Sequence, residues 1–137
     1  MAAEESQETP LRVTPFQLLG GEEAAVRRIV DRFYDIMDSD PALASLRAMH
    51  AADLTPMRDK LTWFLTGWLG GPPRYAEQNK GSVCITDAHR PFPIDEAARD
   101  QWMACMRRAL EETGASEGLR KMLDLPLLRM AEFLRNR

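Results

Sequence analysis

The chain has 137 residues, of which 45% are apolar and 28% charged, and its formal net charge is −3. This length suits one domain with one core, and the composition is that of a globular protein. The slightly negative charge argues against a nucleic-acid surface, because phosphate binding needs concentrated lysine and arginine.

The two cysteines, Cys84 and Cys105, are far apart and form no Cys-x-x-Cys motif. This spacing argues against a disulfide framework and a zinc site, and it fits a reducing compartment. The stretch 1–9 is acidic and lacks the apolar core of a secretion signal. No apolar run reaches the roughly 18 residues that a membrane span needs. We therefore expect a soluble cytoplasmic protein without a membrane partner.

The N-terminal part of the chain divides at about residue 14. Residues 1–13 show no helical period, so we expect a flexible leader followed by one domain over residues 14–137. Residues 14–19 are expected to form one short helical turn. Gly20 and Gly21 would end this turn.

Two helices are expected next. In residues 22–37 apolar side chains recur at steps of three and four, which is typical of an amphipathic helix. Asp40-Pro41 is typical of an N-cap followed by proline in the first turn, and it predicts a short helix to about residue 49. The inward face of the first helix would carry Val26, Ile29, Val30, Phe33, Tyr34 and Met37.

The middle of the chain begins with another capped helix. Thr55-Pro56 repeats the capping pattern, and the Gly-Gly-Pro-Pro run at 70–73 stops the helix. Residues 74–93 have no clean period, so short helical turns and a loop are expected there, with 82–86 the only strand-like stretch. The apolar face of the helix would carry Met57, Leu61, Phe64, Leu65, Trp68 and Leu69.

The C-terminal part predicts two long helices. Asp95 caps the first, and residues 114–118 separate it from the second, over 119–134, which Pro126 should kink or divide. Four substantial helices without a convincing sheet predict an all-α fold. The inward residues of the first of these helices would be Ala98, Trp102, Cys105, Met106, Ala109 and Leu110.

His89 is the first candidate for chemistry. A histidine in a loop is more often a surface residue than a ligand. A haem iron, however, needs one neutral imidazole nitrogen and flat apolar contact around it. Phe92 and Ile94 could supply that contact, and Pro91 and Pro93 would stiffen the segment.

Three further side chains have both a structural and a functional interpretation. Tyr34 and Trp102 lie on apolar helix faces, where such residues usually form part of the core. Their O–H and N–H groups could instead donate to a ligand on the iron. His50 follows a short helix and could simply be exposed.

Taken together, these residues lie in a pattern that resembles a known family. The chain is similar to the truncated haemoglobins of the second group, the short two-over-two helical globins, in order and spacing over residues 18–110. The stretches that carry this resemblance are Gly20-Gly21 and residues 30–34, 60–75, 88–94 and 98–106.

The resemblance implies haem b, iron protoporphyrin IX, as the cofactor. It implies His89 as the proximal iron ligand and Tyr34, Trp102 and His50 as distal hydrogen-bond donors. Whether His50 or Tyr34 binds the iron directly in the absence of an external ligand stays open. The implied haem-pocket residues are Phe33, Met57, Lys60, Leu61, Phe64, Tyr75, Arg90, Phe92, Ile94 and Met106.

The sequence departs from the family pattern at one position beside the proximal histidine. Relatives commonly have an arginine immediately before it for a haem propionate, and this chain has Ala88. Propionate anchoring would then come from Lys60 or Arg90. The leader is also outside the family core.

The implied function is binding of dioxygen, nitric oxide or carbon monoxide at a five-coordinate iron. Donors that hold oxygen tightly would make bulk oxygen transport a poor role. Nitric oxide detoxification, peroxide turnover or ligand sensing fit better, with a reductase as a candidate partner and a monomer or homodimer as the assembly.

Two alternatives from other classes remain. One is a cofactor-free helical interaction module in which Trp63, Trp68 and Trp102 only pack. The other is a cysteine-based redox enzyme using Cys84 near His89, although no recognisable third residue orients a base there. An absorption spectrum of the purified protein distinguishes all three.

Overall fold

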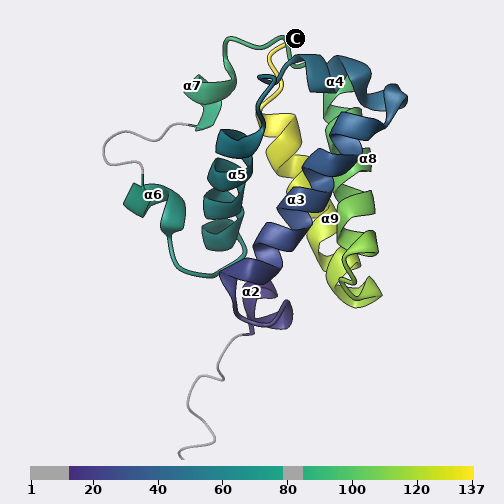
Figure 1. Ribbon diagram of the computed structural model, residues 1–137. Coiled ribbons are helices and arrows are strands. Elements are labelled where there is room, and N and C mark those ends of the chain that lie inside the picture. The colour runs from purple at the N-terminus through teal and green to yellow at the C-terminus, as the bar shows by residue number, and fades with distance from the viewer. Residues whose placement is uncertain (1–12, 79–84) are drawn as a thin grey trace, which may run out of the picture.

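The computed structural model describes residues 13–78 and 85–137 (Figure 1). Most of the expected leader, Cys84 and most of the strand-like stretch 82–86 therefore lie outside the described residues. The regular elements of the described ranges are all helical, which confirms the all-α fold class. They are α2 (Pro15–Leu18), α3 (Glu23–Ser39), η1 (Pro41–Leu43), α4 (Ala44–Ala48), α5 (Thr55–Trp68), α6 (Arg74–Gln78), α7 (Ile85–His89), α8 (Glu96–Glu112) and α9 (Glu117–Phe133).

Four long helices form the body of the molecule. Helix α3 packs against both α5 and α8, and α8 packs against α9. Figure 1 shows α3 running diagonally between α5 and α8, with α9 behind it. The short helices α6 and α7 lie on the outer side of α5, away from α8. None of the helices in the described ranges is both long and apolar enough to cross a bilayer.

Helix α3 supplies much of the core. The predicted inward residues are all buried, together with Ile36. The helix continues to Ser39, two residues beyond the predicted end, and Asp40 then begins the next element. The Asp40 carboxylate accepts a hydrogen bond from the Ala42 N–H at 2.9 Å, as expected for a capping aspartate.

The end of α5 is joined to the start of α2 by a close backbone approach. Gly70 has φ +100°, and a Cβ built there would lie 2.6 Å from the Cβ of Thr14. The Phe16 N–H donates to the Leu69 carbonyl at 2.9 Å. Thr14 and Gln17 form a capping box at this point. Only glycine suits residue 70, because it alone tolerates both this φ and this contact.

Two helix details bear on the sequence-based expectations. The side chain of Thr55 does not cap α5, since the Asp53 carboxylate accepts from the Thr55 N–H at 3.0 Å instead. A kink or a division was expected at Pro126, and α9 is not divided there. Pro126 is exposed, so the backbone group that it leaves unpaired can be solvated, while Leu123 and Leu127 remain buried.

Candidate functional site

His89 is the last residue of α7, and its side chain is half-buried. The Nδ1–H donates to the carbonyl oxygen of Ile85 at 2.6 Å. In this tautomer Nε2 carries the free lone pair, which is the arrangement that metal-binding imidazoles adopt when a backbone carbonyl orients them. The local helix therefore prepares one nitrogen of His89 as a potential ligand.

The loop after His89 is held by the end of the chain. Phe92 is 39% exposed and Ile94 is half-buried. The Asn136 side chain hydrogen-bonds to the backbone of both residues. Arg90 forms an ion pair with Asp87 at 2.6 Å. Sequence reasoning missed Asn136, because a single polar residue after the last helix has no periodic signal.

An aromatic cluster lies where α3, α4 and α8 meet. The Phe33 ring centroid is 4.9 Å from that of Tyr34 and 5.4 Å from that of Trp102. The Tyr34 ring is 5.9 Å from the His50 imidazole. The fold thus gathers the three proposed donors, Tyr34, Trp102 and His50, around Phe33, although they are far apart in sequence.

Two polar groups of this cluster are unused. Among the described residues, no partner accepts a hydrogen bond from the Tyr34 hydroxyl or from the Trp102 indole N–H. Tyr34 is only 3% exposed, and burial raises the pKa of its phenol above the ordinary value. At neutral pH the phenol therefore keeps its proton and can donate.

Nδ1 of His50 is hydrogen-bonded to the backbone, and the pKa of its imidazole is lowered. Its Nδ1–H donates to the Leu46 carbonyl at 2.9 Å. Burial lowers its pKa below the ordinary value of 6.5, and the nearby positive charge of Arg47 also favours the neutral form. In this neutral tautomer Nε2 accepts hydrogen bonds. His50 becomes a donor through Nε2 only when it is protonated.

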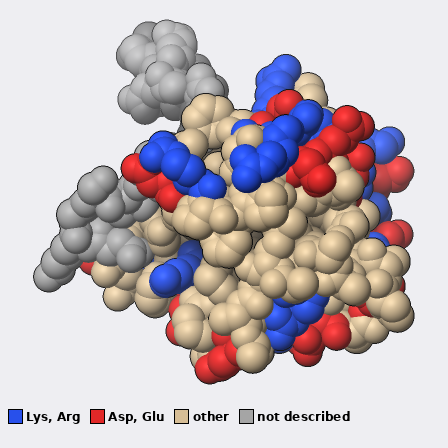
Figure 2. Space-filling model, turned by 90° about the horizontal axis from the view of Figure 1, so that it is seen from above, with Lys and Arg blue, Asp and Glu red and all other residues tan. Residues whose placement is uncertain are grey.

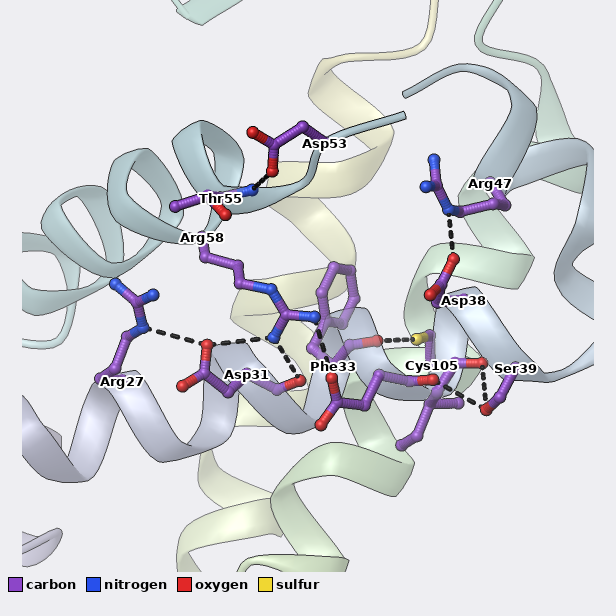
Figure 3. Close-up of polar contacts among 12 residues, drawn as sticks. Arg27, Asp31, Phe33, Asp38, Ser39, Arg47, Asp53, Thr55, Arg58 and Cys105 are labelled. Atoms are coloured by element: carbon purple, nitrogen blue, oxygen red, sulfur yellow. Dashed lines mark hydrogen bonds and ion pairs between the residues drawn. The ribbon is translucent and has the colours of Figure 1, made fainter. Parts of the chain in front are cut away.

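Arg47 shapes the loop that carries His50. Its guanidinium donates to the carbonyls of Ala51 at 2.9 Å and Ala52 at 3.0 Å. Asp38 holds the same guanidinium through a 2.8 Å contact to Nε (Figure 3). This arginine therefore satisfies backbone carbonyls of the loop that follows α4.

A second arginine joins the two helices that border the aromatic cluster. Arg58 of α5 donates to the Asp31 carboxylate at 3.1 Å and to the Asp35 carboxylate at 2.8 Å, both on α3 (Figure 3). Its guanidinium carbon lies 5.8 Å from the centroid of the Tyr34 ring. Arg27 extends the network through Asp31 at 3.0 Å. These contacts fix Tyr34 relative to α5.

Cys105 is fully buried between α8 and α3 (Figure 3). Its thiol donates to the Phe33 carbonyl at 3.1 Å, which supports the residue at the centre of the aromatic cluster. Burial raises the pKa of this thiol to about 12. A cysteine in this environment is a structural residue, not a nucleophile.

The remaining predicted pocket residues differ in burial. Phe33 and Met106 are fully buried, as core residues are. Met57, Leu61 and Phe64 pack against the core but keep an accessible surface. Tyr75 is half-buried, with its ring centroid 6.1 Å from that of Phe64, and Lys60 is exposed.

These half-buried side chains present the kind of surface that a flat apolar cofactor contacts. Apolar and aromatic surfaces stay uncovered on α5 and α6, His89 offers Nε2, and two donors are unpaired in the aromatic cluster. A small apolar cavity lies elsewhere in the core, among α3, α5, α8 and α9. Of the predicted pocket residues, only Met106 lines that cavity.

Charges cover the molecular surface in mixed form. Figure 2, seen from the end that carries α4, shows Lys and Arg side chains interspersed with Asp and Glu. Ion pairs are common among the described residues, as in the Arg99–Glu132 contact at 2.7 Å and the Arg107–Asp124 contact at 2.7 Å. The face shown in Figure 2 therefore has no continuous basic stripe.

Comparison with known proteins identifies the family. A model of the bacterial-like globin family matches residues 14–136. The chain is 35% identical over 109 residues to the group 2 truncated hemoglobin YjbI of Bacillus subtilis, covering 80% of this chain and 78% of that protein. The chain belongs to the group II truncated globins.

Solved structures of truncated globins agree with this assignment. The group II 2-on-2 hemoglobin of Agrobacterium tumefaciens is 39% identical, with a TM-score of 0.84 over 94% of this chain and 98% of that chain. The truncated oxygen-avid haemoglobin of Bacillus subtilis is 33% identical, with a TM-score of 0.77 over 90% of this chain and 99% of that chain. The resemblance noted from the sequence is thus confirmed, and with it membership of a family of haem- and oxygen-binding globins.

Proposed function

We propose that this truncated globin holds haem b through Nε2 of His89 and binds dioxygen, nitric oxide or carbon monoxide on the opposite side, next to Tyr34 and Trp102. The proposal rests on two hydrogen-bond donors of the aromatic cluster, the Tyr34 hydroxyl and the Trp102 indole N–H, that have no acceptor among the described residues. It rests also on the hydrogen bond from His89 Nδ1 to the Ile85 carbonyl, which leaves Nε2 free. The haem iron supplies, when bound, the site for the diatomic ligand and its electron chemistry.

Each protein group has a distinct task in this proposal. His89 is presented by a carbonyl that fixes its tautomer. Tyr34 and Trp102 donate to a ligand that acquires negative charge. His50 cannot donate in its neutral tautomer, because its one N–H is committed to Leu46. We propose that His50 joins the two donors only as the pH falls.

The strength of ligand retention follows from the donors. One hydrogen bond is worth about 0.5–1.5 kcal/mol net, and about 1.4 kcal/mol corresponds to a factor of ten. Two donors would slow oxygen release by roughly one to two orders of magnitude. The structurally similar Bacillus subtilis protein is described as oxygen-avid, which supports the same behaviour here. Redox chemistry, detoxification or sensing then suit this globin better than bulk transport, with a reductase as the partner for turnover.

Lys60 is the proposed anchor for a haem propionate. Arg90 is already paired with Asp87 at 2.6 Å, whereas Lys60 of α5 is exposed and has no ion-pair partner among the described residues. A Lys60→Met variant should lose haem faster than the parent, and an Arg90→Met variant should lose it at nearly the parental rate. Equal rates for the two variants would contradict this assignment.

Absorption spectroscopy tests the central proposal. The purified protein, supplied with haem, should show an intense violet band that shifts when carbon monoxide is added to the ferrous form. The His89→Ala variant should lose or alter this spectrum. A colourless parent protein that takes up no haem would favour the alternative of a cofactor-free helical interaction module.

A further inference from the structure

The end of the chain returns to the segment that carries His89. Figure 1 shows the C-terminal stretch meeting the loop that follows α7 at the top of the molecule. The backbone N–H groups of Asn136 and Arg137 both donate to the Ile94 carbonyl, at 2.9 Å and 3.1 Å. The contact joins residues that are separated in sequence by the two long helices α8 and α9.

The Asn136 side chain completes this contact. Its Oδ1 accepts from the Ile94 N–H at 2.9 Å, and its Nδ2 donates to the Phe92 carbonyl at 2.8 Å. A longer contact of 3.4 Å runs from Nδ2 to the carbonyl of His89 itself. An amide is needed for this pattern, because a carboxylate could accept from Ile94 but could not donate to Phe92.

The segment around His89 has few ties of its own. Helix α7 has only five residues, too short to be stable without tertiary contacts. Pro91 and Pro93 have no N–H to donate. Apart from the hydrogen bonds inside α7 itself, the described backbone bonds within the segment run from the Arg90 N–H to the Asp87 carbonyl at 3.3 Å and from the Phe92 N–H to the His89 carbonyl at 3.0 Å. The position of His89 therefore depends on bonds from elsewhere.

We propose that Asn136 is a positioning residue for His89: it clamps residues 89–94 and thereby fixes where the imidazole stands. This inference rests on the proposed role of His89 as the haem ligand. The clamp couples the end of α9 to the iron-binding residue without touching the cofactor. A loosened clamp lets the end of α7 move, so Nε2 is presented over a wider range of positions.

Three full-length variants test the proposal. Asn136→Ala removes the acceptor and the donor, and Asn136→Asp keeps only the acceptor. Ser116→Ala is the matched control, since it removes the hydrogen bond to the Leu119 N–H that caps the other end of the same helix. The control weakens α9 without touching the clamp.

The first readout uses the protein without haem. Hydrogen exchange at the Ile94 amide should be about fivefold faster in Asn136→Ala. This factor corresponds to the loss of the two side-chain hydrogen bonds to Ile94 and Phe92, each taken at the low end of the usual range for a hydrogen bond. Nitrogen NMR of His89 should show a smaller fraction of the Nδ1–H tautomer. Ser116→Ala should change neither. Unchanged exchange and tautomer in Asn136→Ala would overturn the proposal.

The second readout uses the haem-loaded protein. The iron–histidine stretching band in the ferrous form should shift or broaden in Asn136→Ala, and less in Asn136→Asp, while Ser116→Ala keeps the parental band. A parental band in Asn136→Ala would overturn the proposal. If His89→Ala retained haem with an unaltered spectrum, the proposed function would fail instead, and the exchange data would still report whether the clamp exists.

Discussion

Removal of the Tyr34 hydroxyl should separate ligand retention from stability. Tyr34 is 3% exposed, yet no residue in the described ranges accepts a hydrogen bond from its hydroxyl. Tyr34→Phe therefore breaks no bond within the protein, and the ring contacts with Phe33 and His50 remain available. The free energy of unfolding of the haem-free protein should stay within about 1 kcal/mol of the parent, or rise.

The rate of oxygen release, unlike the stability, should change in Tyr34→Phe. Loss of one donor worth about 0.5–1.5 kcal/mol, or more toward charge, should accelerate dissociation by roughly three- to tenfold. Stopped-flow mixing of the oxygenated ferrous protein with carbon monoxide measures this rate. Urea unfolding of the haem-free protein measures stability.

A remote hydroxyl provides the control for both measurements. Thr113 caps the end of α8, and its hydroxyl donates to the Ala109 carbonyl at 2.7 Å. Thr113→Val should lower stability or leave it unchanged and should not affect oxygen release. If Tyr34→Phe destabilised the protein by several kcal/mol while oxygen release stayed at the parental rate, the hydroxyl would be structural and the reasoning would be refuted.

Three further perturbations test the surrounding structure. Arg58→Met should destabilise the protein by about 1–2 kcal/mol in urea unfolding at low salt, and by less at high salt, because the half-exposed carboxylates of Asp31 and Asp35 each lose an ion-pair contact. The pKa of His50 is lowered on folding, so the unfolded chain binds more protons and the stability of the parent protein should fall as the pH drops below 6.5. His50→Phe should flatten that decline, and an unchanged slope would count against the burial of this imidazole. Gly70→Ala should lower the melting temperature, since a positive φ costs about 1–2 kcal/mol before the 2.6 Å clash with Thr14 is added. Gly118→Ala in α9, where an added Cβ meets nothing within 4 Å, should raise the melting temperature slightly.

The sequence predicts the helical body well, because burial has a period. Val26, Val30 and Phe33 recur on one face of α3, and the structure buries all three. The helix ends are less certain, since several side chains compete to cap them. Thr55 and Asp53 are both plausible caps by type, and only the turn geometry selects the carboxylate of Asp53.

The candidate site is less visible in the sequence than the fold. Periodicity places Tyr34 on a buried face, but the meeting of Tyr34, His50 and Trp102 was expected only from family resemblance. Arg47 and Arg58 look like members of solvated helix faces, although each donates to a carboxylate on α3. Such partners are set by tertiary structure, which leaves no local pattern to detect.

The thiol between α8 and α3 offers a reporter of opening at the centre of the molecule. Cys105 is fully buried and its pKa is raised to about 12, so an alkylating reagent at pH 8 meets neither an accessible sulfur nor a thiolate in the closed protein. In a Cys84→Ser background, the labelling rate would count how often these two helices separate. Comparing that rate with and without haem would measure how far a ligand bound at one edge tightens the middle of the protein.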